Sequence, residues 1–252
     1  MDHFLYKQGE LHAEGVPLSC IAQHVGTPVY VYSAATLTRH FGLFRQALDW
    51  TDHLVCFAVK SNSNLAVLKL LGDLGAGMDV VSGGEYLRAK AAGVLGERIV
   101  FSGVGKTVPE MRLAIEGGIR QFNLESEPEM QALSDLCASM GVEVPVAIRV
   151  NPDVDAKTHE KIATGKSDTK FGIPISRARE VYAEAAALPG LRVVGVDVHI
   201  GSQLTDLDPF RMAYAKVADL TRTLRMVWAR SRRPTPSARE LAAHVVRTTT
   251  RA

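Results

Sequence analysis

Two side chains in this sequence carry a reactive group just after an apolar run. Lys60 follows such a run in FAVKSN, and His199 lies in VDVHIGSQ. A desolvated lysine amine loses its proton more readily and can form a Schiff base with a carbonyl compound. An imidazole can stack on a flat ring or transfer protons. Taken singly, each is also compatible with a structural role, as a solvated lysine or as a histidine bonded to a backbone carbonyl.

Small and acidic residues accompany His199. Gly201 and Ser202 follow it and offer a closely approachable backbone and a hydroxyl, which suit a phosphate group. Asp197 precedes His199 by two residues, so the two side chains lie on the same side of a strand. Asp197 is therefore a candidate structural partner of the imidazole.

A third group of candidates consists of opposite charges inside apolar runs. Arg149 lies in PVAIRV, and Asp79 lies in GMDVVS. Apolar neighbours on both sides predict that Arg149 points inward and is paired, with Asp79 or Glu125 as its partner. A structural ion pair and a substrate contact are both open interpretations.

Motifs for nucleotide and metal binding are incomplete. SGVGKT at 102–107 ends like a phosphate-binding loop, but the first glycine of that motif would fall at Val100. His159 and Glu160 begin like HExxH, yet position 163 is alanine. No group of His, Cys and acidic residues has zinc spacing, so we expect no metal.

Short apolar runs alternate with segments of helical periodicity from residue 53 onward. This alternation predicts parallel strands joined by right-handed crossovers, and the continuous apolarity predicts strands buried on both faces. A doubly wound sheet and a (β/α)8 barrel both fit. The barrel is favoured because polar candidates recur at strand ends, the active face of a barrel. Strands are expected at 53–59, 77–82, 98–102, 121–125, 145–150 and 191–200.

The predicted fold class is α/β, an incomplete (β/α)8 (TIM-like) barrel with about six β/α units at 36–225. A closed barrel has eight units, and MVWARSRRPTPSAREL after Leu224 contains no convincing strand, although Ser237 could begin a short helix. Residues 1–35 are expected to belong to a second, β-rich domain, with a short helix at 17–26 and a strand at 27–33.

Residues 226–252 form an atypical Arg-rich tail. Six arginines, no lysine and one acidic residue give this tail a net charge of +5, against +2 for the whole chain. We expect a chain that left its reading frame near residue 225 or a gene cut short, with a naturally variable C-terminus as the alternative. Six strands without the rest of a barrel would leave two unpaired edges and an uncovered core face, which predicts poor folding, aggregation or stabilisation by association.

Overall composition excludes several classes of protein. The chain is 46% hydrophobic and 22% charged, as in ordinary globular proteins, and its small net charge argues against binding to nucleic acid or a membrane surface. Three scattered cysteines without a CxxC pair indicate reduced thiols. The N-terminus lacks the apolar core of a signal peptide, and no apolar run approaches the roughly 18 residues of a membrane span. We therefore expect a soluble cytoplasmic protein.

Seven short motifs occur in one order, each at or just after an expected strand. They are FAVKSN, DVVSGGE, FSGVGKT, FNLES, IRVNPD, THEKIATGKSDTKFGI and VDVHIGSQ. Over about residues 3–225 the series resembles the pyridoxal-phosphate enzymes with the alanine-racemase-like barrel, and among them the diaminopimelate decarboxylases. GTPVYVYS at 26–33 is similar to the N-terminal entry of that family. The KFG region favours the diaminopimelate branch over the ornithine and arginine decarboxylases.

The resemblance implies a role for each candidate residue. Lys60 would hold pyridoxal phosphate covalently, His199 would stack on its pyridine ring, and Ser202 beside Gly201 would bind its phosphate. Asp79 and Arg149 would line the site and orient the lysine and the substrate. The implied reaction is loss of CO2 from the D-centre of meso-diaminopimelate, an amino-acid substrate, to give L-lysine. The full-length family is a homodimer.

The sequence also departs from the family pattern. The glycine-rich phosphate loop after strand seven and the Glu-Pro-Gly-Arg segment at strand eight are not found. The acid that keeps the pyridine nitrogen protonated and the C-terminal β-domain are also missing. We therefore expect an impaired form of the enzyme. The alternatives are a non-catalytic protein that binds pyridoxal phosphate or a partner, and a sister amino-acid decarboxylase or racemase.

Overall fold

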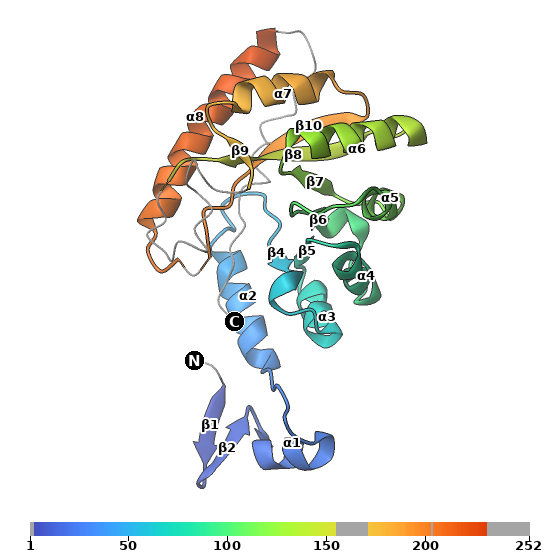
Figure 1. Ribbon diagram of the computed structural model, residues 1–252. Coiled ribbons are helices and arrows are strands. Elements are labelled where there is room, and N and C mark those ends of the chain that lie inside the picture. The colour runs from blue at the N-terminus through green and yellow to red at the C-terminus, as the bar shows by residue number, and fades with distance from the viewer. Residues whose placement is uncertain (1–2, 155–170, 203, 231–252) are drawn as a thin grey trace.

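The computed structural model describes residues 3–154, 171–202 and 204–230, the last five of them as backbone alone. Figure 1 shows a parallel sheet with helices along it and a small antiparallel sheet at the N-terminal end, away from the larger one. Residues 155–170, which hold most of the THEKIATGKSDTKFGI motif, lie outside the described part. The same is true of residues 231–252, including the helix expected from Ser237.

In the described part of the chain, six parallel strands form the main path of the larger sheet, in the order β10-β8-β7-β6-β5-β4. A further short strand, β9, pairs with the end of β8. Each of the six lies in one of the expected runs, so the predicted parallel α/β architecture is confirmed. The strands are β4 (Cys56–Ala58), β5 (Gly77–Val80), β6 (Ile99–Phe101), β7 (Gln121–Leu124), β8 (Val144–Asn151), β9 (Ile173–Pro174) and β10 (Leu191–Asp197).

Helices connect these strands and begin at side-chain caps. The side chains of Asn64, Ser82 and Ser126 accept backbone N–H groups of the first turns of α3, α4 and α6. No described helix combines the length and apolarity that a membrane crossing requires. The helices of this part are α3 (Leu65–Asp73), α4 (Gly83–Ala91), α5 (Val108–Glu116), α6 (Glu127–Met140), α7 (Ala178–Ala187) and α8 (Asp208–Arg230), with the 3-10 turns η1 (Val59–Ser61) and η2 (Gly96–Arg98).

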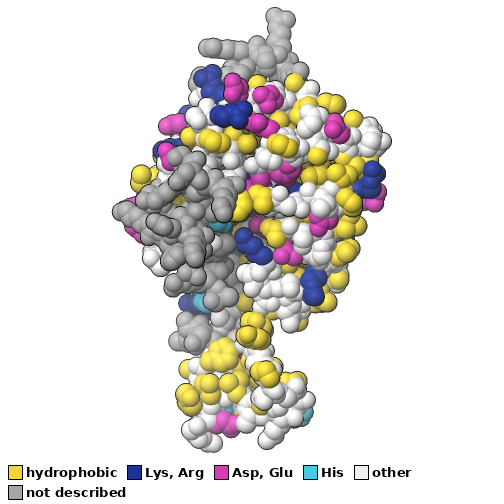
Figure 2. Space-filling view, viewed as in Figure 1, with side chains coloured by type: hydrophobic (Ala, Val, Ile, Leu, Met, Phe, Trp, Pro, Cys, Tyr) yellow, Lys and Arg dark blue, Asp and Glu magenta, His cyan; other side chains and the backbone are white. Residues whose placement is uncertain are grey.

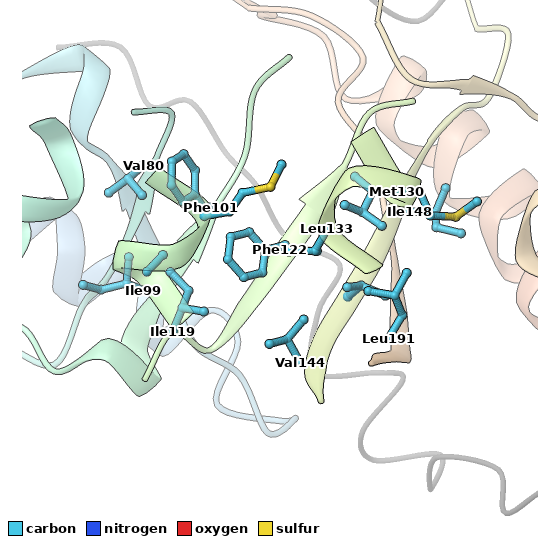
Figure 3. Close-up of a cluster of buried hydrophobic side chains, with 14 of the residues drawn as sticks. Val80, Ile99, Phe101, Ile119, Phe122, Met130, Leu133, Val144, Ile148 and Leu191 are labelled. Carbon is cyan, nitrogen blue, oxygen red and sulfur yellow. The ribbon is translucent and has the colours of Figure 1, made fainter. Parts of the chain in front are cut away.

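The core lies between the strands and the helices that cover them. Phe101 of β6 and Phe122 of β7 are fully buried and stack with their ring centroids 5.9 Å apart (Figure 3). Leu133 of α6 packs in the same buried cluster. All four residues of β5 and of β7 are buried, so both faces of these strands are covered. The expected continuous apolarity does not hold for them, because Asp79, Gln121 and Asn123 are buried polar residues.

The N-terminal part differs from the sequence prediction at one segment. An antiparallel sheet of β1 (Phe4–Lys7), β2 (Glu10–Ala13) and β3 (Val16–Pro17) precedes α1 (Leu18–Val25), which confirms the helix expected at 17–26. The strand expected at 27–33 is wrong: no described strand pairs with this segment, and Tyr30 is 88% exposed. The chain then enters α2 (Ala34–Gln46), which periodicity did not predict because none of its residues is fully buried.

Three glutamates in first helical turns fasten the loops that follow strands. Glu85 of α4 accepts from the backbone N of Val81 at 2.9 Å, and Glu129 of α6 accepts from the backbone N of Glu125 at 2.8 Å. Glu110 of α5 accepts from the backbone N of Thr107 at 3.0 Å and from that of Gly83 at 2.7 Å. Each carboxylate satisfies backbone donors that a helix start leaves unpaired. Figure 2 shows acidic side chains among hydrophobic ones on one face of the molecule.

The close approach of α5 to α4 makes one glycine intolerant of a side chain. A Cβ on Gly117 would lie 1.8 Å from the hydroxyl oxygen of the buried Tyr86. We expect Gly117→Ala to lower the free energy of unfolding by about 1–3 kcal/mol, the cost of overpacking. Urea unfolding measures this change in the free energy of unfolding. Gly42→Ala in α2 is the control, because a Cβ on Gly42 meets no atom within 4 Å. Equal stability of the two variants would contradict the packing.

The pH dependence of folding should report on Glu110. Hydrogen bonds from Gly83 and Thr107 lower the pKa of the Glu110 carboxyl. A lowered pKa stabilises the fold above the unfolded carboxyl pKa of about 4.3, and this stability is lost as the pH falls through the folded value. We expect Glu110→Gln to cost about 0.5–2 kcal/mol at pH 7, and less below pH ~4. Glu116→Gln, at an exposed position of the same helix, is the control. If the stability difference between Glu110→Gln and the unmodified chain stays constant with pH, the lowered pKa of Glu110 is contradicted.

Candidate functional site

Lys60 lies in η1, directly after β4, and is exposed. The Glu85 carboxylate lies within electrostatic reach of Lys60, and the Asp79 carboxylate lies within reach of Glu85. Burial raises the pKa of Glu85; the negative charge of Asp79 adds to this rise, and the positive charge of Lys60 opposes it. The Lys60 amine thus has the Glu85 carboxylate from the first turn of α4 near it, and Asp79 of the neighbouring strand β5 is close to Glu85.

Asp79 is the end point of a hydrogen-bond chain that crosses three strands. The Ser102 hydroxyl donates to Asp79 Oδ1 at 2.6 Å, and Asn123 Nδ2 donates to Ser102 Oγ at 3.0 Å. Gln121 Nε2 donates in turn to Asn123 Oδ1 at 2.7 Å. All four side chains are buried. Each hydrogen bond of this series donates in the direction of the Asp79 carboxylate. Such a chain holds the carboxylate in one orientation.

Arg149 of β8 is paired with Glu125, which follows β7. Its Nη1 lies 2.9 Å from Oε1 and 2.8 Å from Oε2 of Glu125, and the two side chains are 9% and 1% exposed. Glu125 also accepts from the backbone N of Gly103 at 3.0 Å. The guanidinium carbon lies 5.5 Å from the ring centroid of Phe171. The prediction of an inward, paired Arg149 is confirmed, with Glu125 as the partner.

His199 follows the end of β10 and is half-buried. Its Nδ1 accepts from the backbone N of Gly201 at 3.2 Å, so the neutral ring carries its proton on Nε2. Gly201 has φ +134°, a conformation that residues with a side chain rarely adopt. The buried glycine and the half-buried Ser202 therefore form a tight turn beside the imidazole.

The candidates share the carboxyl edge of the parallel sheet, the edge that carries the active site in barrel enzymes. Lys60 follows β4 and Asp79 lies on the adjacent β5, at one end of the strand order, and Arg149 on β8 is paired with Glu125 after β7. His199, Gly201 and Ser202 follow β10, at the other end of that order.

Sequence reasoning gave no role to Glu85, Ser102 or Asn123. The signal was present, because Ser82 and Glu85 have the spacing of a capping box. Ser102 ends one apolar run and Asn123 interrupts another, and a buried polar residue requires a partner. Which partner each side chain meets depends on strand register, which the sequence does not state.

The fold and the strand-end lysine with its acidic neighbours are those of an α/β-barrel enzyme domain. Residues 34–229 match the family described as pyridoxal-dependent decarboxylase, pyridoxal binding domain, and the chain belongs to this family. The family uses pyridoxal phosphate.

Curated relatives of this chain are diaminopimelate decarboxylases. Diaminopimelate decarboxylase of Pseudomonas fluorescens is 56% identical over 211 residues, which cover 83% of this chain and 51% of the relative. The Pseudomonas aeruginosa enzyme is 54% identical over 220 residues, 87% of this chain and 53% of the relative. This chain thus spans about half the length of the curated relatives it matches.

Solved structures agree with this placement. Diaminopimelate decarboxylase from Helicobacter pylori, complexed with L-lysine, superposes with a TM-score of 0.81 at 39% identity over 84% of this chain and 54% of the other. The M. jannaschii enzyme superposes with a TM-score of 0.82 at 37% identity over 90% of this chain and 54% of the other. A lysine decarboxylase from Selenomonas ruminantium, 23% identical with a TM-score of 0.73, shares the fold.

The described residues are chemically suited to pyridoxal phosphate. Lys60 presents an exposed primary amine, the group that condenses with the cofactor's aldehyde. The turn at Gly201 brings backbone and the Ser202 hydroxyl together. Arg149 offers a positive charge, and Glu125 engages only its Nη1.

Breaking the Glu125–Arg149 pair should destabilise the fold strongly. Arg149→Met leaves a buried carboxylate without its cation, which costs about 3–5 kcal/mol. The double variant Arg149→Met/Glu125→Met removes both charges and should recover part of that loss. Denaturant unfolding of the single and double variants measures the difference. A double variant that is no more stable than Arg149→Met would contradict the buried pair.

Proposed function

We propose that this chain is the pyridoxal-phosphate-binding part of a diaminopimelate decarboxylase. The reaction removes CO2 from the D-centre of meso-2,6-diaminopimelate and yields L-lysine. The observation that carries the proposal is Lys60, an exposed amine directly after β4 that lies within electrostatic reach of Glu85. Sequence identity of 54–56% to curated decarboxylases supports the substrate, as does L-lysine in the Helicobacter pylori structure.

The cofactor, when bound, supplies an electron sink for the pair of electrons left behind by CO2. The side chains of this chain then have separate tasks. Lys60 would hold the cofactor through its amine. His199, whose Nδ1 is held by the Gly201 backbone, would stack on the cofactor's ring. Asp79, which is fixed by the Ser102 hydroxyl, would orient Lys60.

Phosphate binding is assigned to the turn after β10. Ser202 would donate its hydroxyl to the phosphate, and Gly201 would permit close approach of the backbone. Arg149, held by Glu125, orients the anionic groups of the substrate.

The proposal also covers the division of the chain into parts. In this proposal residues 36–225 form the cofactor-binding unit, residues 1–35 belong to a β-rich domain, and 226–252 is an atypical tail. The assembled enzyme is a cytoplasmic homodimer. Because the chain spans about half the length of its relatives, a second candidate is a unit that binds pyridoxal phosphate without turnover.

Cofactor attachment tests the proposal directly. Incubation of the chain with pyridoxal phosphate should produce a visible absorbance band, and borohydride reduction should place the adduct on Lys60 in peptide maps. Lys60→Arg should abolish the band, whereas Lys69→Arg, an exposed lysine of α3, should retain it. Label scattered over several lysines would refute a specific site. CO2 release from meso-diaminopimelate by the cofactor-loaded protein, assayed without borohydride reduction, separates the enzyme from the non-catalytic binder.

A further inference from the structure

Lys106 is the lysine of SGVGKT, the segment that resembles a nucleotide phosphate loop, but its side chain points into the protein. The side chain is fully buried, at 0% exposure. Its ammonium donates to the backbone O of Gly103 at 2.6 Å, to the backbone O of Asn123 at 2.8 Å and to Glu129 Oε1 at 2.5 Å. An ammonium has three donors, so these three acceptors satisfy it. The group is therefore committed to protein contacts and is not presented to a ligand.

The three acceptors belong to the elements that position Glu125. Gly103 donates its backbone N to Glu125 Oε1 at 3.0 Å, while its carbonyl is held by Lys106. Glu129 accepts from Lys106 through Oε1 and from the backbone N of Glu125 through Oε2 at 2.8 Å. Lys106 thus fixes Gly103, whose backbone N donates to the Glu125 carboxylate. Through Glu129 it also fixes the backbone of Glu125 itself.

We propose that Lys106 is a positioning residue, which holds the Glu125 carboxylate in place to orient Arg149 at the carboxyl edge of the sheet. Glu125 contacts Arg149 at 2.8–2.9 Å, so one clamp fixes the loop after β6, the end of β7 and a side chain of β8. An effect of Lys106 on ligand binding rests on the proposed function of Arg149. An effect of Lys106 on the orientation of Arg149 does not depend on that function.

Side-chain NMR of the full chain tests the geometric step without any cofactor. The Arg149 Nε–Hε and Nη–Hη signals report rotation of the guanidinium, which the Glu125 contact hinders. We expect Lys106→Met to speed this rotation about tenfold, the factor that corresponds to ~1.4 kcal/mol. Lys90→Met, at an exposed position of α4, is the matched control and should leave the rotation unchanged.

Two further variants distinguish a specific effect on the orientation of Arg149 from an overall loss of stability. Gly117→Ala destabilises the packing of α5 on α4, away from the ion pair, and should keep the Arg149 signals of the unmodified chain. Lys106→Met/Glu129→Met removes both buried charges, which preserves folding better than removal of one. If Lys106→Met alone does not fold, this double variant should still show faster rotation. Unchanged Arg149 rotation in a folded variant that lacks Lys106 overturns the proposal.

Titration with pyridoxal phosphate, followed by absorbance, then connects geometry to function. We expect Lys106→Met to weaken cofactor or substrate-analogue binding about tenfold relative to Lys90→Met. Faster Arg149 rotation with unchanged binding supports the positioning role and contradicts the assignment of Arg149 to the ligand site. Faster rotation with weaker binding supports both.

Discussion

The ion pair between Glu125 and Arg149 is the interaction on which the polar edge of the sheet depends. Both side chains are almost fully buried, and a buried charge that loses its partner costs about 3–5 kcal/mol. Glu125 avoids that cost by accepting from Arg149 and from the Gly103 backbone. Because these partners come from β8 and from the loop after β6, one carboxylate sets the relative positions of three neighbouring strand ends.

Short strands make such carboxylates necessary. The strands β4 to β7 contain only three or four residues each, so the ladder hydrogen bonds between them are few. The loops after β5, β6 and β7 gain order instead from Glu85, Glu110 and Glu129 at helix starts. Helix N-termini attract negative charge, so a glutamate in the first turn stabilises both the helix and the preceding loop. The same residues therefore serve folding and the geometry of the site.

Sequence reasoning was most successful where burial decides structure. The six runs of the parallel sheet were predicted because strands covered on both faces are rich in apolar residues, and the few polar residues inside them, such as Asp79 and Asn123, are paired with one another. It failed at 27–33, where aromatic and β-branched residues such as Tyr30 and Tyr32 are typical of a strand but no described strand lies beside them. Strand formation needs a partner, and a propensity cannot supply one. For Arg149 the sequence left two acidic partners open, and the register of β7 against β8 selects Glu125.

The SGVGKT segment shows why a motif must be judged by its surroundings. A phosphate loop presents free backbone N–H groups at a helix start together with a lysine that reaches the ligand. Here the backbone N of Thr107 already donates to Glu110, and Lys106 is buried against Glu129. The carboxylates of the protein occupy the positions that an anion would take. Phosphate binding at this edge therefore needs a different turn, and the one after β10 has the positive φ of Gly201 and an adjacent hydroxyl. These contacts support the proposal that Ser202 binds the cofactor's phosphate, and they show that Lys106 is committed to the protein's own structure.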